Sequence, residues 1–171
     1  MKYLSIDPAT EKRKKQAWAS FEDRTILSYG RCTLDELNHL IQAHDSVFCE
    51  DQYVAFPYGG KTREWRAKVQ GVINLAHTAG QIERMAKTQG KQFQYVDPGT
   101  WQARILGAGP GVKAAAREET AVKMAKMYIK TYLGEKEAEK RIGVDIGCAI
   151  CIGICGIGQI ELDQLKERRF R

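Results

Sequence analysis

The apolar positions along the chain follow two periods, one typical of strands and one typical of helices. Short β-branched and aromatic runs predict strands at residues 2–6, 16–21, 25–29, 47–49 and 92–96. Apolar positions three and four residues apart predict helices at residues 34–41, 62–89, 100–106, 113–133 and 144–166. The first three strands follow one another as hairpins, whereas the later strands alternate with helices. This order predicts an α/β fold with a mixed sheet and helical layers, and the absence of repeats and linkers predicts a single domain over residues 1–171.

Composition narrows the class of protein only slightly. Hydrophobic residues make up 43% of the 171 positions and charged residues 28%, as in an ordinary globular protein. The net charge of +6 fits a polyanionic partner but does not separate nucleic acid from a membrane surface. The uncharged run at residues 146–158 is shorter than the roughly 20 residues that a membrane span needs, so it predicts a buried element and no membrane partner.

The cysteine pattern and the N-terminus favour a reducing, cytoplasmic setting. Five cysteines are an odd number without a regular framework spacing, so we expect free thiols. The chain opens directly on a strand-like segment, and no secretory signal is expected. Cys148, Cys151 and Cys155 share one helix face; small core residues are a more frequent reason for this spacing than a metal cluster.

Three carboxylates stand at the ends of predicted elements that are far apart in the sequence. Asp7 ends the first strand in "LSIDPAT", Glu50 ends the fourth strand, and Asp145 opens the last helix. An Asp-Pro pair at a strand end is also a common turn, so Asp7 alone decides nothing. Carboxylates suit Mg²⁺, and a site with two such ions can activate water and stabilise the leaving oxygen of a phosphodiester. In an open sheet such groups gather where strands end.

Four segments together resemble the RuvC-type Holliday-junction resolvases of the ribonuclease H-like superfamily. The segments are "LSIDPAT", "VFCEDQYV", "YVDPGTWQARILG" and "VDIGCAICIG", in the family's order and over essentially the whole chain. The resemblance implies a mixed five-stranded sheet flanked by helices. It also implies an endonuclease that resolves four-way DNA junctions by metal-dependent hydrolysis in paired strands, acts as a homodimer, and takes part in DNA recombination and repair in a bacterium or a phage-infected cell.

The resemblance also assigns roles to individual residues. Asp7, Glu50 and Asp145 fall on metal-binding catalytic acids for Mg²⁺, with Mn²⁺ possible, and Lys113 falls on a basic residue near the scissile phosphate. The family has a second helix ligand three residues after the first, where this chain has Cys148. A thiol is a soft, poor ligand for magnesium. Either three carboxylates suffice, or the site is degenerate, or the register of the last helix differs.

Aromatic and basic residues in two stretches are candidates for DNA contact. An aromatic side chain can stack on an unpaired base, and neighbouring basic groups can bind phosphates; packing of the aromatic loop onto a helix is an equally good interpretation. The candidate residues are Tyr53, Phe56, Tyr58, Lys61, Arg63, Arg66, Arg104 and Arg117.

Three other functions stay open from the sequence. A non-catalytic junction-binding protein with the same fold is favoured by Cys148. A broader nuclease for branched DNA or RNA–DNA hybrids would use the same acids. An actin-like phosphotransferase could share "IDPAT" and "VDIG", but such proteins need two domains and this chain has the length of one.

Overall fold

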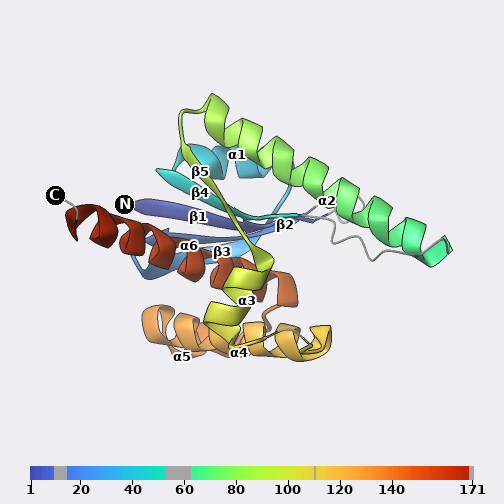
Figure 1. The fold of residues 1–171 in the computed structure, drawn as a ribbon. Coiled ribbons are helices and arrows are strands. Elements are labelled where there is room, and N and C mark those ends of the chain that lie inside the picture. Colours follow the sequence, from blue (N-terminus) through green and yellow to red (C-terminus); the bar gives the residue numbers. More distant parts are fainter. Residues whose placement is uncertain (10–14, 53–62, 110, 170–171) are drawn as a thin grey trace.

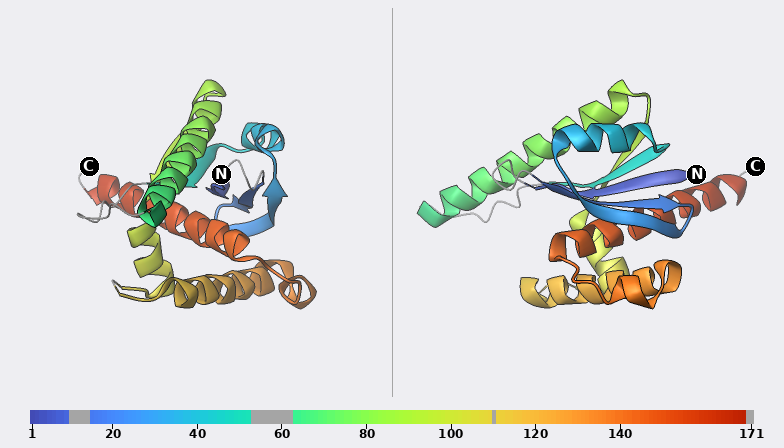
Figure 2. Two further views of the ribbon diagram at one scale, coloured as in Figure 1. Left: turned by 90° about the vertical axis from the view of Figure 1, so that its right-hand side faces the viewer. Right: turned by 180° about the vertical axis from the view of Figure 1, so that it is seen from behind.

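The chain folds around one five-stranded sheet that has helices on both faces (Figures 1 and 2). The computed structural model describes residues 1–9, 15–52, 63–109 and 111–169, with the backbone alone for 63–68 and 169. In chain order the elements are β1 (Lys2–Asp7), β2 (Gln16–Glu22), β3 (Thr25–Cys32), α1 (Leu34–Gln42), β4 (Ser46–Glu50), α2 (Arg63–Thr88), β5 (Gln92–Val96), α3 (Pro98–Leu106), α4 (Ala114–Leu133), α5 (Glu135–Ala138) and α6 (Val144–Arg169).

The strands run in the order β3-β2-β1-β4-β5 and form the predicted mixed sheet. β1 pairs antiparallel with β2, and β2 antiparallel with β3, so the first three strands form the expected meander. β1 pairs parallel with β4, and β4 parallel with β5, through the helical crossovers that parallel strands require. The mixed sheet flanked by helices is thereby confirmed.

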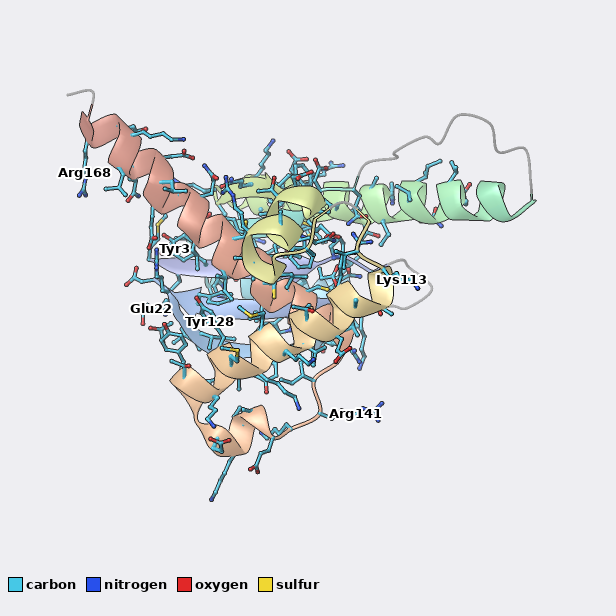
Figure 3. All side chains as sticks on the ribbon, turned by 60° about the horizontal axis from the view of Figure 1, so that its bottom comes forward. Tyr3, Glu22, Lys113, Tyr128, Arg141 and Arg168 are labelled. Atoms are coloured by element: carbon cyan, nitrogen blue, oxygen red, sulfur yellow. The ribbon has the colours of Figure 1, made fainter. Side chains whose placement is uncertain are left out.

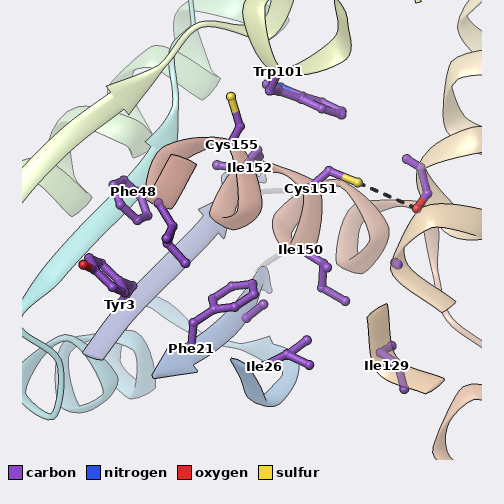
Figure 4. Packing of buried hydrophobic residues seen from close by; sticks show 14 of the residues in the cluster. Tyr3, Phe21, Ile26, Phe48, Trp101, Ile129, Ile150, Cys151, Ile152 and Cys155 are labelled. Carbon is purple, nitrogen blue, oxygen red and sulfur yellow. Dashed lines mark hydrogen bonds between the residues drawn. The ribbon is translucent and has the colours of Figure 1, made fainter. Parts of the chain in front are cut away.

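Alternate side chains of the strands supply two hydrophobic cores, one on each face of the sheet. Leu4 and Ile6 of β1 point to the face that α1 and α2 cover. Tyr3 of β1 and Phe48 of β4 point to the opposite face, where α6 lies and is itself covered by α4 (Figures 2 and 4). This period-two alternation explains why the strand pattern could be recognised in the sequence.

Helix α6 is the central helix of its layer and fulfils the prediction of a buried element. Ala149, Ile150, Cys151 and Ile152 are fully buried between the sheet and α4 (Figure 4). By length and composition alone, Val144–Arg168 is apolar enough to cross a membrane, but half of its most apolar window is buried inside the protein. Packing in the core accounts for the apolar character of those residues.

Local capping signals explain where two helices begin. Thr33 and Glu36 form a reciprocal capping box at the start of α1. α3 begins at Pro98 instead of the predicted residue 100, because the carboxylate of Asp97 accepts the Thr100 N–H at 2.6 Å. Proline is well suited to the first position of a helix, where its missing N–H is not needed.

Candidate active site at the sheet edge

Asp7, Glu50 and Asp145 are brought to one edge of the sheet by three different elements. β1 and β4 are parallel neighbours with Ile6 opposite Cys49, so the next residue on each strand, Asp7 and Glu50, ends at the same edge. α6 is fixed on β1 by the Ser5 hydroxyl, which donates to the Ala149 carbonyl at 2.7 Å. Asp145, in the first turn of α6, therefore lies beside the two strand ends.

The three carboxylates line a single cavity of about 570 Å³. The other lining residues come from β3, α3, α4 and α6. They are Arg31, Trp101, Gln102, Ala114, Arg117, Glu118, Val144 and Cys148. A larger cleft of about 850 Å³ between α1 and α2 is lined, among the described residues, by one carboxylate, Asp35, and by none of the predicted site residues.

Glu50 is held by hydrogen bonds to both of its carboxylate oxygens. Trp101 Nε1 donates to Oε1 at 2.9 Å, and Gln52 Nε2 donates to Oε2 at 2.8 Å. Burial raises the pKa of the Glu50 carboxyl above its usual value, and the two hydrogen bonds oppose that rise by stabilising the charged form. The carboxylate is therefore fixed in orientation at the wall of the cavity.

Asp145 is engaged by an arginine that the sequence did not single out. Arg31, near the end of β3, forms a charge-assisted hydrogen bond from Nη2 to Asp145 Oδ1. Burial alone would raise the pKa of Asp145, but the hydrogen bond and the positive charge of Arg31 outweigh it, so the pKa lies below its usual value. Asp145 is thus an ionised group with a resident counter-ion.

Cys148 lies in the same cavity, one helical turn after Asp145, as the predicted spacing requires. Burial raises the pKa of its thiol strongly, and the negative charges of Asp7 and Glu50 raise it further. The sulfur is therefore a protonated thiol at neutral pH and a weak ligand for a hard cation. Cys151 and Cys155 are buried core residues, and all five cysteines are free thiols.

The donor chemistry of the cavity fits a divalent cation such as Mg²⁺ or Mn²⁺. Asp7, Glu50 and Asp145 offer the carboxylate oxygens that such ions prefer. In the part of the chain that the structure describes, however, no three His, Cys, Asp or Glu side chains are already grouped closely enough to hold an ion. In this structure Asp145 is paired with Arg31 instead.

The other predicted residues are distributed around this cavity or outside the described residues. Arg117 lines the cavity and donates to Gln102 Oε1 at 2.6 Å. Arg104 lies elsewhere and donates to Gln159 Oε1 at 2.6 Å on α6. Lys113 is exposed at the N-terminal end of α4 (Figure 3) and does not line the cavity. Only the backbones of Arg63 and Arg66, in α2, are described, and the following predicted residues lie outside the described ranges: Tyr53, Phe56, Tyr58 and Lys61.

Sequence reasoning missed four polar residues of the cavity, namely Arg31, Trp101, Gln102 and Glu118. Arg31 lies beyond the predicted end of the third strand, so no pattern placed it near the acids. Trp101 stands in a quoted motif, but its bond to a carboxylate 51 positions away has no local signal. Glu118 is an exposed acid on α4 that reaches the cavity because α4 packs against α6.

Known proteins resemble this chain in their three-dimensional fold. No protein-family model and no curated protein sequence matches the chain. Among solved structures, Thermus thermophilus RuvC is similar with a TM-score of 0.55 and 14% identity, over 95% of this chain and 97% of that one. T. thermophilus RuvC in complex with a Holliday junction substrate is similar with a TM-score of 0.52 and 14% identity, over 94% and 96%. The chain therefore has a RuvC-like, ribonuclease H-like fold.

Proposed function

We propose that this protein is a structure-selective endonuclease that cuts four-way DNA junctions in paired strands by metal-dependent phosphodiester hydrolysis. The observation that carries the proposal is the convergence of Asp7, Glu50 and Asp145 on one cavity from β1, β4 and α6. The RuvC-like fold supports it, because one similar structure is that of a RuvC bound to a Holliday junction substrate.

Each carboxylate would have a distinct environment in such a reaction. Glu50 is oriented by Trp101 and Gln52, whereas Asp145 is oriented by Arg31. Together with Asp7 these groups would hold Mg²⁺ or Mn²⁺, which when bound supplies an activated water and stabilises the leaving oxygen. The protein's own contribution is to fix the acids on rigid elements, where their positions are set by the sheet and by the packing of α6.

Basic residues beside the cavity would bind the DNA backbone. Arg117 lines the cavity, and Lys113 lies exposed just before the first turn of the same helix. Phosphate contacts of this kind position DNA and carry no sequence information by themselves. A four-way junction with two-fold symmetry would be cut by two copies of the chain, so the proposal includes a homodimer acting on DNA in the cytoplasm.

A non-catalytic junction-binding protein is the second candidate, and two observations favour it. Cys148 stands as a protonated thiol where the resemblance expects an acid, and Arg31 engages Asp145. Such a protein would bind a four-way junction through the same basic groups and leave it uncut in any divalent cation.

Cleavage of an end-labelled synthetic four-way junction separates the two candidates. The wild type, Asp7→Asn and Cys148→Asp are each incubated with Mg²⁺ and then with Mn²⁺, beside a linear duplex of the same sequence. The proposal expects the wild type to cut the junction but not the duplex, and Asp7→Asn to bind without cutting. Binding without cutting by all three proteins would refute the nuclease and support the junction-binding protein. Cutting by Cys148→Asp alone would identify a disabled ligand position.

The proposed dimer has its own measurement. Light scattering coupled to size-exclusion chromatography should give a mass of about twice the 19.3 kDa of the chain. A mass of one chain at every protein concentration, with junctions still cut in both paired strands, would contradict the two-fold arrangement.

A further inference from the structure

The ion pair between Arg31 and Asp145 lies where a side chain at position 143 would otherwise be. Arg31 comes from β3 at one side of the cavity, and Asp145 comes from the first turn of α6. Gly143 lies just before that turn. A Cβ atom there would collide with Arg31 Nη2 and would come within 2.7 Å of Asp145 Oδ1. Glycine at position 143 therefore leaves the room in which the two charged groups meet.

Among the residues that the structure describes, Arg31 and Arg117 are the two arginines that line the cavity, and they differ in their partners. Arg117 donates to the neutral amide of Gln102, whereas Arg31 bonds directly to a carboxylate that would bind the cation. In the described part of the chain, the other acids facing this space are Asp7, Glu50 and Glu118. Of the two arginines, Arg31 is thus the one that bonds to a candidate metal ligand.

We propose that Arg31 is a positioning residue that holds Asp145 in the cation-free protein and competes with the divalent cation for that carboxylate. This inference rests on the proposed function, because it assigns the state of the same site before the cation binds. The oxygen that accepts from Arg31 cannot face the guanidinium and a cation at once without bringing two positive charges together. The guanidinium is always charged, so only displacement releases Asp145.

Competition and a purely structural role predict opposite changes in cation affinity when Arg31 is replaced. If Arg31 only supported the fold of the cavity, removing it would weaken cation binding. If Arg31 competes with the cation, Arg31→Gln should bind Mn²⁺ more tightly. Exposed or half-exposed ion pairs are weak, so the expected gain is at most about fivefold in affinity.

The test is calorimetric titration of Mn²⁺ into the DNA-free protein, with wild type, Arg31→Gln and Arg31→Lys. Arg31→Lys keeps the charge and should bind Mn²⁺ nearly as the wild type does. Arg24→Gln is the matched control, because Arg24 also pairs with a carboxylate, that of Glu161, and does not line the cavity. Its Mn²⁺ affinity should equal that of the wild type. Thermal unfolding of all four proteins verifies that each variant is folded.

Equal or weaker Mn²⁺ binding by Arg31→Gln would overturn the competition. The junction-cleavage assay is a separate readout, so the two proposals can fail independently. A wild type that cuts junctions, together with an Arg31→Gln that binds Mn²⁺ no more tightly, contradicts the role of Arg31 alone. Tighter Mn²⁺ binding by Arg31→Gln, with no junction cut by any variant, supports the role of Arg31 and refutes the nuclease.

Discussion

The close contact of α6 with the sheet predicts opposite effects for the same substitution at two of its glycines. A Cβ atom at Gly153 would collide with Phe21 Cε2 and would come within 2.8 Å of Phe21 Cζ and Ser5 Oγ. Phe21 and Ser5 are both fully buried in the sheet, so neither can move aside at low cost. At Gly158, further along the same helix, an added Cβ atom meets nothing within 4 Å.

The magnitudes follow from two terms that act on the free energy of unfolding. Alanine is favoured over glycine in a helix interior by up to about 1 kcal/mol at either position. Overpacking a buried contact costs about 1–3 kcal/mol, and this term applies to Gly153→Ala alone. Gly158→Ala should therefore stabilise the protein by about 0.5–1 kcal/mol, whereas Gly153→Ala should leave it up to about 2 kcal/mol less stable.

Urea unfolding followed by circular dichroism measures both effects. The two variants should shift the midpoint in opposite directions with the same slope as the wild type, because the surface exposed on unfolding is unchanged. Stabilisation by Gly153→Ala as large as that by Gly158→Ala would refute the packing of α6 against Phe21 and Ser5. The placement of Asp145 at the sheet edge depends on that packing.

Three further predictions concern the acids, the DNA contacts and pH. Asp7→Asn should abolish junction cleavage in gel assays and leave junction affinity largely intact; cleavage at the wild-type rate would exclude Asp7 from the site. Arg117→Gln should weaken junction binding and lower the slope of log affinity against log salt by about one, whereas Arg24→Gln should leave that slope unchanged. Burial lowers the pKa of His44 in the folded protein. On acidification, His44 is therefore protonated at a higher pH in the unfolded chain than in the folded protein. The free energy of unfolding should then fall as pH drops below about 6.5, and His44→Gln should reduce that fall in urea unfolding; an unchanged pH dependence would contradict it.

The strands were predictable because their side chains alternate between two buried faces. β1, β4 and β5 match the predicted runs to within a residue. β3 extends three residues beyond its prediction, to Cys32, because pairing with β2 places Cys32 opposite Gln16 and so includes Gly30 and Arg31 in the strand. Cross-strand pairing of this kind has no periodic signal in the sequence. The short helix α5 was likewise not predicted, since four residues are too few for a helical period.

The acids of the site were predictable from strand ends, but their partners were not. Asp7 and Glu50 follow apolar strands that lie side by side and parallel, which brings both to one edge. The contacts of Trp101 with Glu50 and of Arg31 with Asp145 join residues 51 and 114 positions apart. Such contacts depend on the packing of whole elements, so local patterns do not contain them.

Mapping of the cuts in a four-way junction is the decisive test of whether Asp7, Glu50 and Asp145 form a nuclease site. Each strand of the junction is labelled in turn, and wild type and Glu50→Gln are compared on denaturing gels with Mg²⁺, with Mn²⁺ and without a cation. Glutamine keeps the shape of Glu50 and can still accept from Trp101, so the fold of the cavity should persist. If the protein is a junction nuclease, the wild type should make cation-dependent cuts at symmetric positions in paired strands, and Glu50→Gln should make none. A junction that the wild type binds and leaves uncut, or cuts equally well after Glu50→Gln, would contradict it.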